Sequence, residues 1–94
     1  MDLLTLKYFV ALAREQHMTK TAQKLLISVP SLSATISRLE KELGVPLFDR
    51  VGRKITLNAS GEVFLKYISQ GLQSIEEGVA RIEEIKNSQT YSIS

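Results

Sequence analysis

The chain has 94 residues, of which 44% are apolar, and a formal net charge of +2. This length favours one small domain with an appended element, and the apolar share is sufficient for a compact core. The sequence contains no cysteine and one histidine, His17, which excludes disulfide frameworks, thiol nucleophiles and the usual zinc-ligand sets. No apolar run approaches the ~18 to 20 residues that a membrane span needs, and nothing resembles a signal peptide, so we expect a cytoplasmic protein without membrane contact.

The charges are distributed unevenly along the chain. Residues 1–54 contain nine Lys and Arg against five Asp and Glu, whereas residues 55–94 contain three against five. A basic front half and an acidic back half indicate a polyanionic partner for the front half. A modest imbalance of this kind is also typical of ordinary solvated surface.

Three helices are predicted before residue 44. Residues 3–15 form the first, because apolar side chains recur there at the i, i+3, i+4, i+7 spacing. Thr19 is placed to cap a second, short helix, and Ser28 caps a third, which ends at Gly44 before Pro46. The expected core-facing side chains are Leu6, Phe9, Val10 and Ala13 in the first helix, Ala22, Leu25 and Leu26 in the second, and Leu32, Ile36, Leu39 and Leu43 in the third.

A hairpin and a long helix are predicted after residue 46. Two short strand-like runs, 47–50 and 54–57, flank residues 51–53. Asn58 can cap a fourth helix that continues to about Asn87, a rod of roughly 45 Å. Its apolar residues have the 3, 4, 3, 4, 3 spacing of a coiled-coil seam, which predicts dimerisation through Leu65, Ile68, Leu72, Ile75, Val79 and Ile82.

The second and third helices have the layout of a helix-turn-helix, whose second helix enters the major groove of DNA. The third helix carries small and basic side chains opposite its apolar stripe, namely Pro30, Ala34, Ser37 and Lys41, flanked by Ser33 and Arg38. Small side chains allow the helix backbone to approach base edges, serines can hydrogen-bond bases or phosphates, and the cations can reach the flanking phosphates. The alternative interpretation is an ordinary solvated helix face.

The hairpin adds a second feature of DNA-binding domains. Arg50, Arg53 and Lys54 place three positive charges within five residues, and Gly52 allows a tight turn. Basic hairpins of this type serve as wings, which contact phosphates or insert an arginine into the minor groove. A solvated basic turn is the alternative, but a helix-turn-helix followed directly by a basic hairpin is harder to explain as plain surface.

Short motifs follow one another in a characteristic order along residues 1–62. They are Phe9-Val10, Thr19-x-x-Ala22, Leu25-x-x-Ser28-x-Pro30-Ser31-Leu32-Ser33, Ile36-Ser37-x-Leu39-Glu40, Leu43-Gly44-x-x-Leu47-Phe48-x-Arg50, Leu57 and Gly61-Glu62. This order resembles the amino-terminal domain of LysR-type transcriptional regulators. The resemblance covers about residues 1–62 continuously, and the long helix that follows is similar to the linker helix of that family.

The resemblance implies a mainly α fold, in which a winged helix-turn-helix of three helices and a two-stranded wing precedes a long dimerising linker helix. It implies a DNA-binding domain over residues 1–58 with the helix-turn-helix at about 18–37, a linker helix over 59–88, and a hinge or the start of an effector-binding domain over 89–94. The end of the chain, 91–94, is similar to the first strand of that effector domain, so we expect a truncated protein that binds DNA without responding to a ligand.

The family further implies a bacterial transcription factor that needs no cofactor. We expect a homodimer on double-stranded DNA in the nucleoid, a tetramer in the intact protein, and a small-molecule effector bound through the missing carboxy-terminal domain.

By the same resemblance, base and backbone contacts fall on the third helix and the wing. The candidate DNA-binding residues are Thr19, Val29, Pro30, Ser31, Ser33, Ala34, Ser37, Arg38, Arg50, Arg53 and Lys54. Val29 stands where the family often has glutamine, and Ala34 where an arginine is frequent. Both differences remove hydrogen-bonding capacity, so the usual base contacts are not expected at these two positions.

Two other classes of function are alternatives. A coiled-coil module that binds proteins through the long helix would explain the seam but would give the basic hairpin no purpose. An enzyme is not expected, because the sequence has no Gly-rich phosphate loop, nucleophile elbow or metal-ligand cluster. His17 is interpreted as an exposed turn residue, and Thr19, Ser28 and Ser60 as helix caps rather than nucleophiles.

Overall fold

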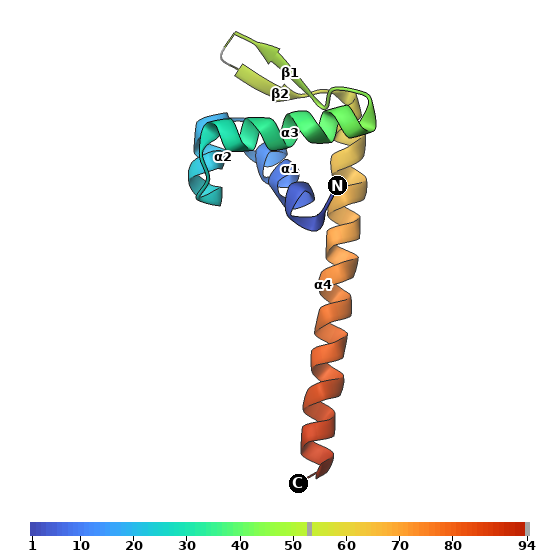
Figure 1. Cartoon of the computed structure of the whole chain (residues 1–94). Helices are drawn as coiled ribbons and strands as arrows, with labels where there is room; N and C mark the ends of the chain where they lie inside the picture. The colour runs from blue at the N-terminus through green and yellow to red at the C-terminus, as the bar shows by residue number, and fades with distance from the viewer. Residues whose placement is uncertain (53, 94) are drawn as a thin grey trace.

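The structure, a computed structural model, describes residues 1–52 and 54–93, and residues 89–93 by their backbone alone. The described residues form a winged body from which one long helix projects, with overall extents of 62 × 26 × 19 Å (Figure 1). The elements are α1 (Leu3–Glu15), α2 (Met18–Leu25), α3 (Val29–Leu43), β1 (Phe48–Val51), β2 (Lys54–Leu57) and α4 (Ala59–Ile93). The predicted fold class, a winged helix-turn-helix followed by a long helix, is confirmed.

The core lies where α1, α3, the hairpin and the start of α4 meet. Phe9 of α1 is fully buried, and its ring contacts the rings of Phe48 and Phe64 at centroid distances of 5.7 and 5.1 Å. Aromatic pairs at such distances and angles add to the free energy of burial. One aromatic side chain therefore joins α1, the wing and α4. The other buried apolar residues are Val10, Leu12, Ala13, Ala22, Leu32, Ile36, Leu39, Leu47 and Ile55.

The connection between α1 and α2 differs from the prediction. Gln16 ends α1 in the left-handed conformation, with φ of 50°, and the next residue, His17, caps α2. The Nδ1 atom of His17 accepts a hydrogen bond from the backbone N–H of Lys20 at 3.1 Å. The prediction that Thr19 caps this helix is therefore wrong, because α2 already begins at Met18.

The turn between α2 and α3 holds a second correction. Leu26 was expected on the inner face of α2, but it ends that helix at φ 59° with 91% of its surface exposed. Thr21 takes an inner position instead, because its hydroxyl donates to the carbonyl oxygen of His17 at 2.7 Å and needs no water. The predicted ends of α3 are confirmed, with Ser28 as N-cap and Gly44 in the left-handed conformation.

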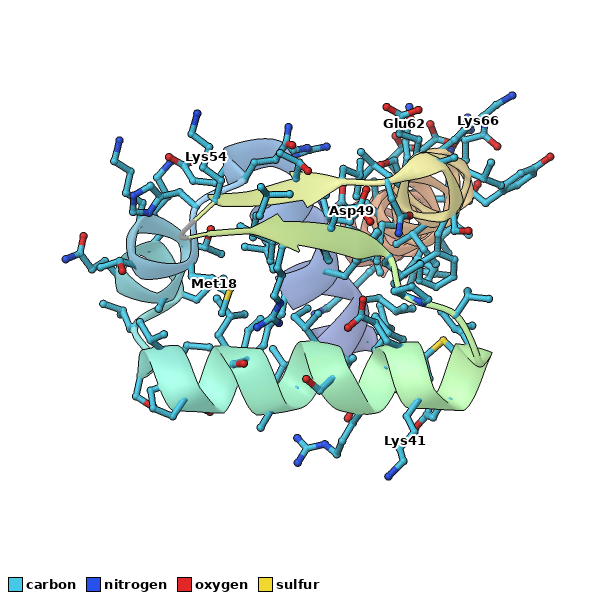
Figure 2. The ribbon with its side chains drawn as sticks, turned by 90° about the horizontal axis from the view of Figure 1, so that it is seen from above. Met18, Lys41, Asp49, Lys54, Glu62 and Lys66 are labelled. Atoms are coloured by element: carbon cyan, nitrogen blue, oxygen red, sulfur yellow. The ribbon has the colours of Figure 1, made fainter. Side chains whose placement is uncertain are left out.

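The hairpin is antiparallel and places Phe48 opposite Leu57 and Arg50 opposite Ile55. The predicted N-cap of α4 is confirmed, because the side-chain oxygen of Asn58 accepts from the N–H of Gly61 at 2.8 Å. In both views the two strands run from the start of α4 along α3 towards α2, so their far ends lie on the side of the body remote from α4 (Figures 1 and 2).

The long helix α4 has two parts with different surroundings. Leu65, Ile68 and Leu72 pack against the core of the winged body, whereas Ile75 and Ile82 are exposed, at 49% and 64%. The helix also continues to Ile93 rather than ending near Asn87, and no glycine or proline after Gly78 interrupts it. The distal part of the apolar seam is thus exposed and does not belong to the core of the described chain.

Candidate nucleic-acid interface

The outer face of α3 is exposed along its length, while the opposite face forms the core. Val29 and Pro30 begin the helix, and both are exposed. Ala34, Ser37 and Lys41 follow on the same side, and Figure 2 shows Lys41 projecting away from the body. Because most of these side chains are short, a partner can approach the helix backbone closely along this face.

The flank of this face is held by hydrogen bonds within α3. Thr35 is buried, and its hydroxyl donates to the carbonyl oxygen of Ser31 at 2.9 Å. The Nη2 atom of Arg38 donates to the same hydroxyl oxygen at 3.4 Å, so the guanidinium is oriented beside the helix. Ser31 is exposed, whereas Ser33 is half-buried and so less accessible than predicted.

Thr19 lies in the first turn of α2 and is exposed. The first turn of this helix presents backbone N–H groups, which is the end of a helix that attracts phosphate. In a helix-turn-helix the first helix crosses the DNA backbone. Thr19 is therefore exposed at the end of α2 where the helix dipole is positive.

The two described cations of the wing lie on opposite faces of the hairpin. Residues alternate between faces along a strand, so Arg50 shares the inner face with its buried partner Ile55. Lys54 pairs with Val51 on the outer face, and Figure 2 shows its side chain projecting away from α3. Both cations are exposed, because the strands extend beyond the core near the turn. Arg53, the third predicted wing cation, lies outside the described residues.

The cations of α3 and the wing are available to a partner. Among the described residues, the Met1 ammonium pairs with Glu42 and Lys24 pairs with Glu15. Neither ion pair involves a cation of α3 or of the wing, namely Arg38, Lys41, Arg50 and Lys54. The hydrogen bond from Lys24 lowers the pKa of Glu15, so this carboxylate is charged at neutral pH. It neutralises one cation of α2, while the cations of the outer face remain.

Two hydrogen bonds that hold the wing had no signal in the sequence. Glu40 of α3 accepts from the N–H of Leu47, and Gln16 accepts from the N–H of Leu57. The second pair is separated by 41 residues. Neither the apolar periodicity of a helix or strand nor the turn propensity of its ends can predict a contact between residues so far apart in the sequence.

Other kinds of site find no support in the described part of the chain. No group of three or more His, Cys, Asp or Glu side chains there could hold a metal ion. No helix within residues 1–52 and 54–93 is both long enough and apolar enough to cross a membrane.

Solved DNA complexes show the same fold. The chain superimposes on the DNA-binding domain of BenM bound to the catB site 1 DNA with a TM-score of 0.85 and 39% identity, over 90% of this chain and 94% of that one. For the CbnR DNA-binding domain in complex with DNA the TM-score is 0.83 and the identity 33%, over 89% and 97% of the two chains.

Sequence relatives are regulators of transcription. YybE of Bacillus subtilis, an uncharacterized HTH-type transcriptional regulator, is 49% identical over 85% of this chain. BsdA of the same organism, also an HTH-type transcriptional regulator, is 44% identical over 92% of the chain. The chain spans 27% and 30% of the length of these two relatives.

The family model for bacterial regulatory helix-turn-helix proteins of the lysR family matches residues 3–62, more than half of the chain. This is a family of DNA-binding regulators and not of enzymes. Because domains of the same fold are solved in complex with DNA, the alternative of a coiled-coil module that binds proteins is not favoured. The predicted resemblance is confirmed, and the chain belongs to the lysR family of bacterial regulatory helix-turn-helix proteins.

Proposed function

We propose that this chain binds double-stranded DNA in a sequence-specific way and regulates bacterial transcription. The observation that carries the proposal is the outer face of α3, which is exposed, short in its side chains and flanked by Arg38 and Lys41. A face of this kind fits the major groove, whose width accepts one helix. Domains of the same fold, those of BenM and CbnR, have been solved in complex with DNA.

The chemistry of the side chains determines which of them contact bases and which contact the DNA backbone. Val29 and Ala34 offer apolar contacts, for which the favourable partner in the major groove is the methyl group of thymine. Ser31, Ser33 and Ser37 can hydrogen-bond bases or phosphates, and Pro30 lets the first turn come close. Arg38, with Thr19 of α2, contacts the DNA backbone, which fixes the register of α3 but reads no sequence.

The wing contacts the DNA beside the groove that α3 occupies. Arg50 and Lys54 lie on opposite faces of a narrow hairpin, so they can reach phosphates on either side of it. Arg53, from its place in the sequence between these two, would insert into the minor groove or neutralise a phosphate. These contacts increase affinity and make it depend on salt.

The chain acts as a homodimer through the distal part of α4. The support is the exposed stripe of Ile75, Val79 and Ile82, which continues the line of Leu65, Ile68 and Leu72 on one face of the helix. An apolar stripe of this length is unusual on a monomer and matches a coiled-coil seam.

The direction of pairing follows from the position of the winged body. Ile68 and Leu72 of the stripe contact the body, so the body lies on the same side of α4 as the exposed stripe. Two parallel helices would bring both bodies into the same space between them. An antiparallel pair places the bodies at opposite ends, where each can engage one half-site of the DNA.

The wider context follows from the family. The chain corresponds to about a quarter to a third of its regulator relatives. In the intact protein, residues 89–94 would lead into an effector-binding domain that takes a small molecule and supports tetramers. The regulator would act in the cytoplasm, on the bacterial nucleoid.

Selection of duplexes from a random library by this chain tests the proposal. We expect enrichment of a sequence with two related half-sites. The affinity for the enriched duplex should fall steeply with salt, with a slope set by the number of phosphates neutralised. A chain that enriches no duplex, or that binds all duplexes equally, would contradict the proposal.

A further inference from the structure

The wing is held to the helices by one side-chain acceptor at the base of each strand. At the base of β1, the Oε2 atom of Glu40 accepts from the N–H groups of Leu47 and Phe48, at 2.6 and 3.4 Å. At the end of β2, the Oε1 atom of Gln16 accepts from the N–H of Leu57 at 3.0 Å. Gln16 lies in the turn between α1 and α2, so this bond joins the wing to the turn that leads into the helix-turn-helix.

The backbone of Gln16 is unusual for its residue type. Its φ of 50° lies in the left-handed region, which costs conformational energy for any residue with a Cβ atom and which glycine adopts freely. The N–H of Gln16 donates to Leu12 at 2.7 Å and ends α1, a role that glycine fills equally well. What glycine lacks is the side-chain oxygen that reaches Leu57.

We propose that Gln16 is a positioning residue for the wing. Its amide oxygen fixes the end of β2 against the α1–α2 turn, and so sets the position of the wing relative to α3. The inference rests on the proposed function, because it concerns how the wing meets DNA while α3 occupies the major groove.

The geometry explains why a second fixed point is needed. A two-stranded hairpin is marginally stable by itself and takes its position from what it packs against. The inner face of this wing buries Phe48 and Ile55, but the residues nearest the turn, Arg50, Val51 and Lys54, are exposed. With both strand bases fixed, the cations near the turn are already in place before DNA binds, and less entropy is lost on binding.

Two substitutions at position 16 separate positioning from stability. Gln16→Met keeps the length of the side chain and the backbone cost but removes the acceptor. Gln16→Gly removes the acceptor and also the conformational energy that the left-handed backbone costs a residue with a Cβ atom. Gln70→Met is the matched control, because Gln70 is exposed on α4 and away from the winged body's interface. Circular dichroism verifies that each variant is folded.

The probe is the duplex that the wild-type chain enriches from a random library. We expect Gln16→Met and Gln16→Gly to bind it about 2- to 10-fold more weakly, the range that corresponds to the net worth of one hydrogen bond. Gln16→Gly should melt at the same temperature as the wild type or higher, although its affinity falls. Amide hydrogen exchange at Leu57, measured without DNA, should be faster in both variants, and Gln70→Met should match the wild type in every assay.

A double-mutant cycle with the wing cations tests whether Gln16 acts on DNA affinity through those cations. In a chain that carries Arg50→Ala and Lys54→Ala, the further change Gln16→Met should weaken binding by a smaller factor than it does in the wild type. If the two effects were independent, they would add in free energy and the factor would be unchanged. The inference is overturned if Gln16→Met binds like the wild type, or if its loss of affinity persists undiminished in the chain without Arg50 and Lys54. A wild-type chain that enriches no duplex would instead overturn the proposed function, whatever the exchange rate at Leu57.

Discussion

The first turn of α4 lies so close to the segment before β1 that a Cβ atom on Gly61 would overlap the carbonyl oxygen of Leu47. The same atom would meet the side chain of Leu57, so neither neighbour can move without shifting the base of the wing. Gly61 is therefore required by close packing, and not by its backbone angles.

Gly61→Ala should destabilise the domain by about 1 to 3 kcal/mol, the range for forcing extra atoms into a packed interior. Urea denaturation measures the change. Gly78→Ala is the control, because nothing lies within 4 Å of its added methyl group. Alanine there should stabilise the helix by about 1 kcal/mol. Equal effects of the two substitutions would show that Gly61 is not closely packed.

Glu40→Ala should weaken the attachment of the wing. Its carboxylate accepts from the N–H groups of Leu47 and Phe48 in a partly buried place, and donors left without an acceptor there cost about 1 to 3 kcal/mol. Glu40→Gln keeps one acceptor oxygen and should cost less than Glu40→Ala. The control, Glu42→Ala, removes an exposed pair with the Met1 ammonium and should cost less than about 1 kcal/mol. Urea denaturation that ranks Glu42→Ala above Glu40→Ala would contradict this prediction.

The N-cap of α1, Asp2, should make the stability of the fold depend on pH. The N–H of Thr5 donates to its carboxylate at 2.8 Å, and this hydrogen bond lowers the pKa of Asp2 below its ordinary value of 3.8. The stabilisation is therefore present above pH 3.8 and is lost as the pH falls through the lowered pKa. Asp2→Ala should lower the melting temperature at neutral pH and make no difference in strong acid. Asp2→Asn, which caps at every pH, should show no such convergence, and a constant deficit for Asp2→Ala would argue against the cap.

The proposed dimer should depend on the distal stripe of α4, namely Ile75, Val79 and Ile82. Val79→Glu combined with Ile82→Glu places charges on two exposed apolar positions and should give monomers in analytical ultracentrifugation. Leu72 is unsuitable for this test, because it packs against the body of its own chain. Gln70→Glu with Ser74→Glu adds the same charge on another face of α4 and should leave the dimer intact. A wild-type chain that sediments as a monomer at tens of micromolar would contradict the pairing.

Val29 should influence which base is preferred in each half-site. It begins α3 and is exposed, and its methyl groups favour thymine. Val29→Gln should shift preference towards adenine at one position of each half-site, by ~1 to 3 kcal/mol. Val45→Gln, beyond the end of α3, is the control and should leave the preference unchanged. Indistinguishable profiles of the wild type and Val29→Gln on a randomised library would mean that residue 29 does not face the bases.

Local signals in the sequence determined most of the fold. Ser28, Gly44 and Asn58 occupy the caps predicted for them, because the chemistry that ends a helix acts within a few residues of the end. The apolar period of α3 likewise identified the face that remains exposed. The resemblance to the lysR family depends on such short-range motifs, and for that reason the amino-acid sequence alone is sufficient to detect it.

The tertiary structure decided which of several local possibilities is used. Thr19 and His17 are both able to cap α2, and the path of the chain after Gln16 selects His17. The seam of α4 has one uniform spacing, yet its first three members pack on the body and its last three are exposed, because the body covers only the first part of the helix. The contact of Gln16 with Leu57 could not be predicted either, because residues 41 positions apart meet only when the whole domain is assembled.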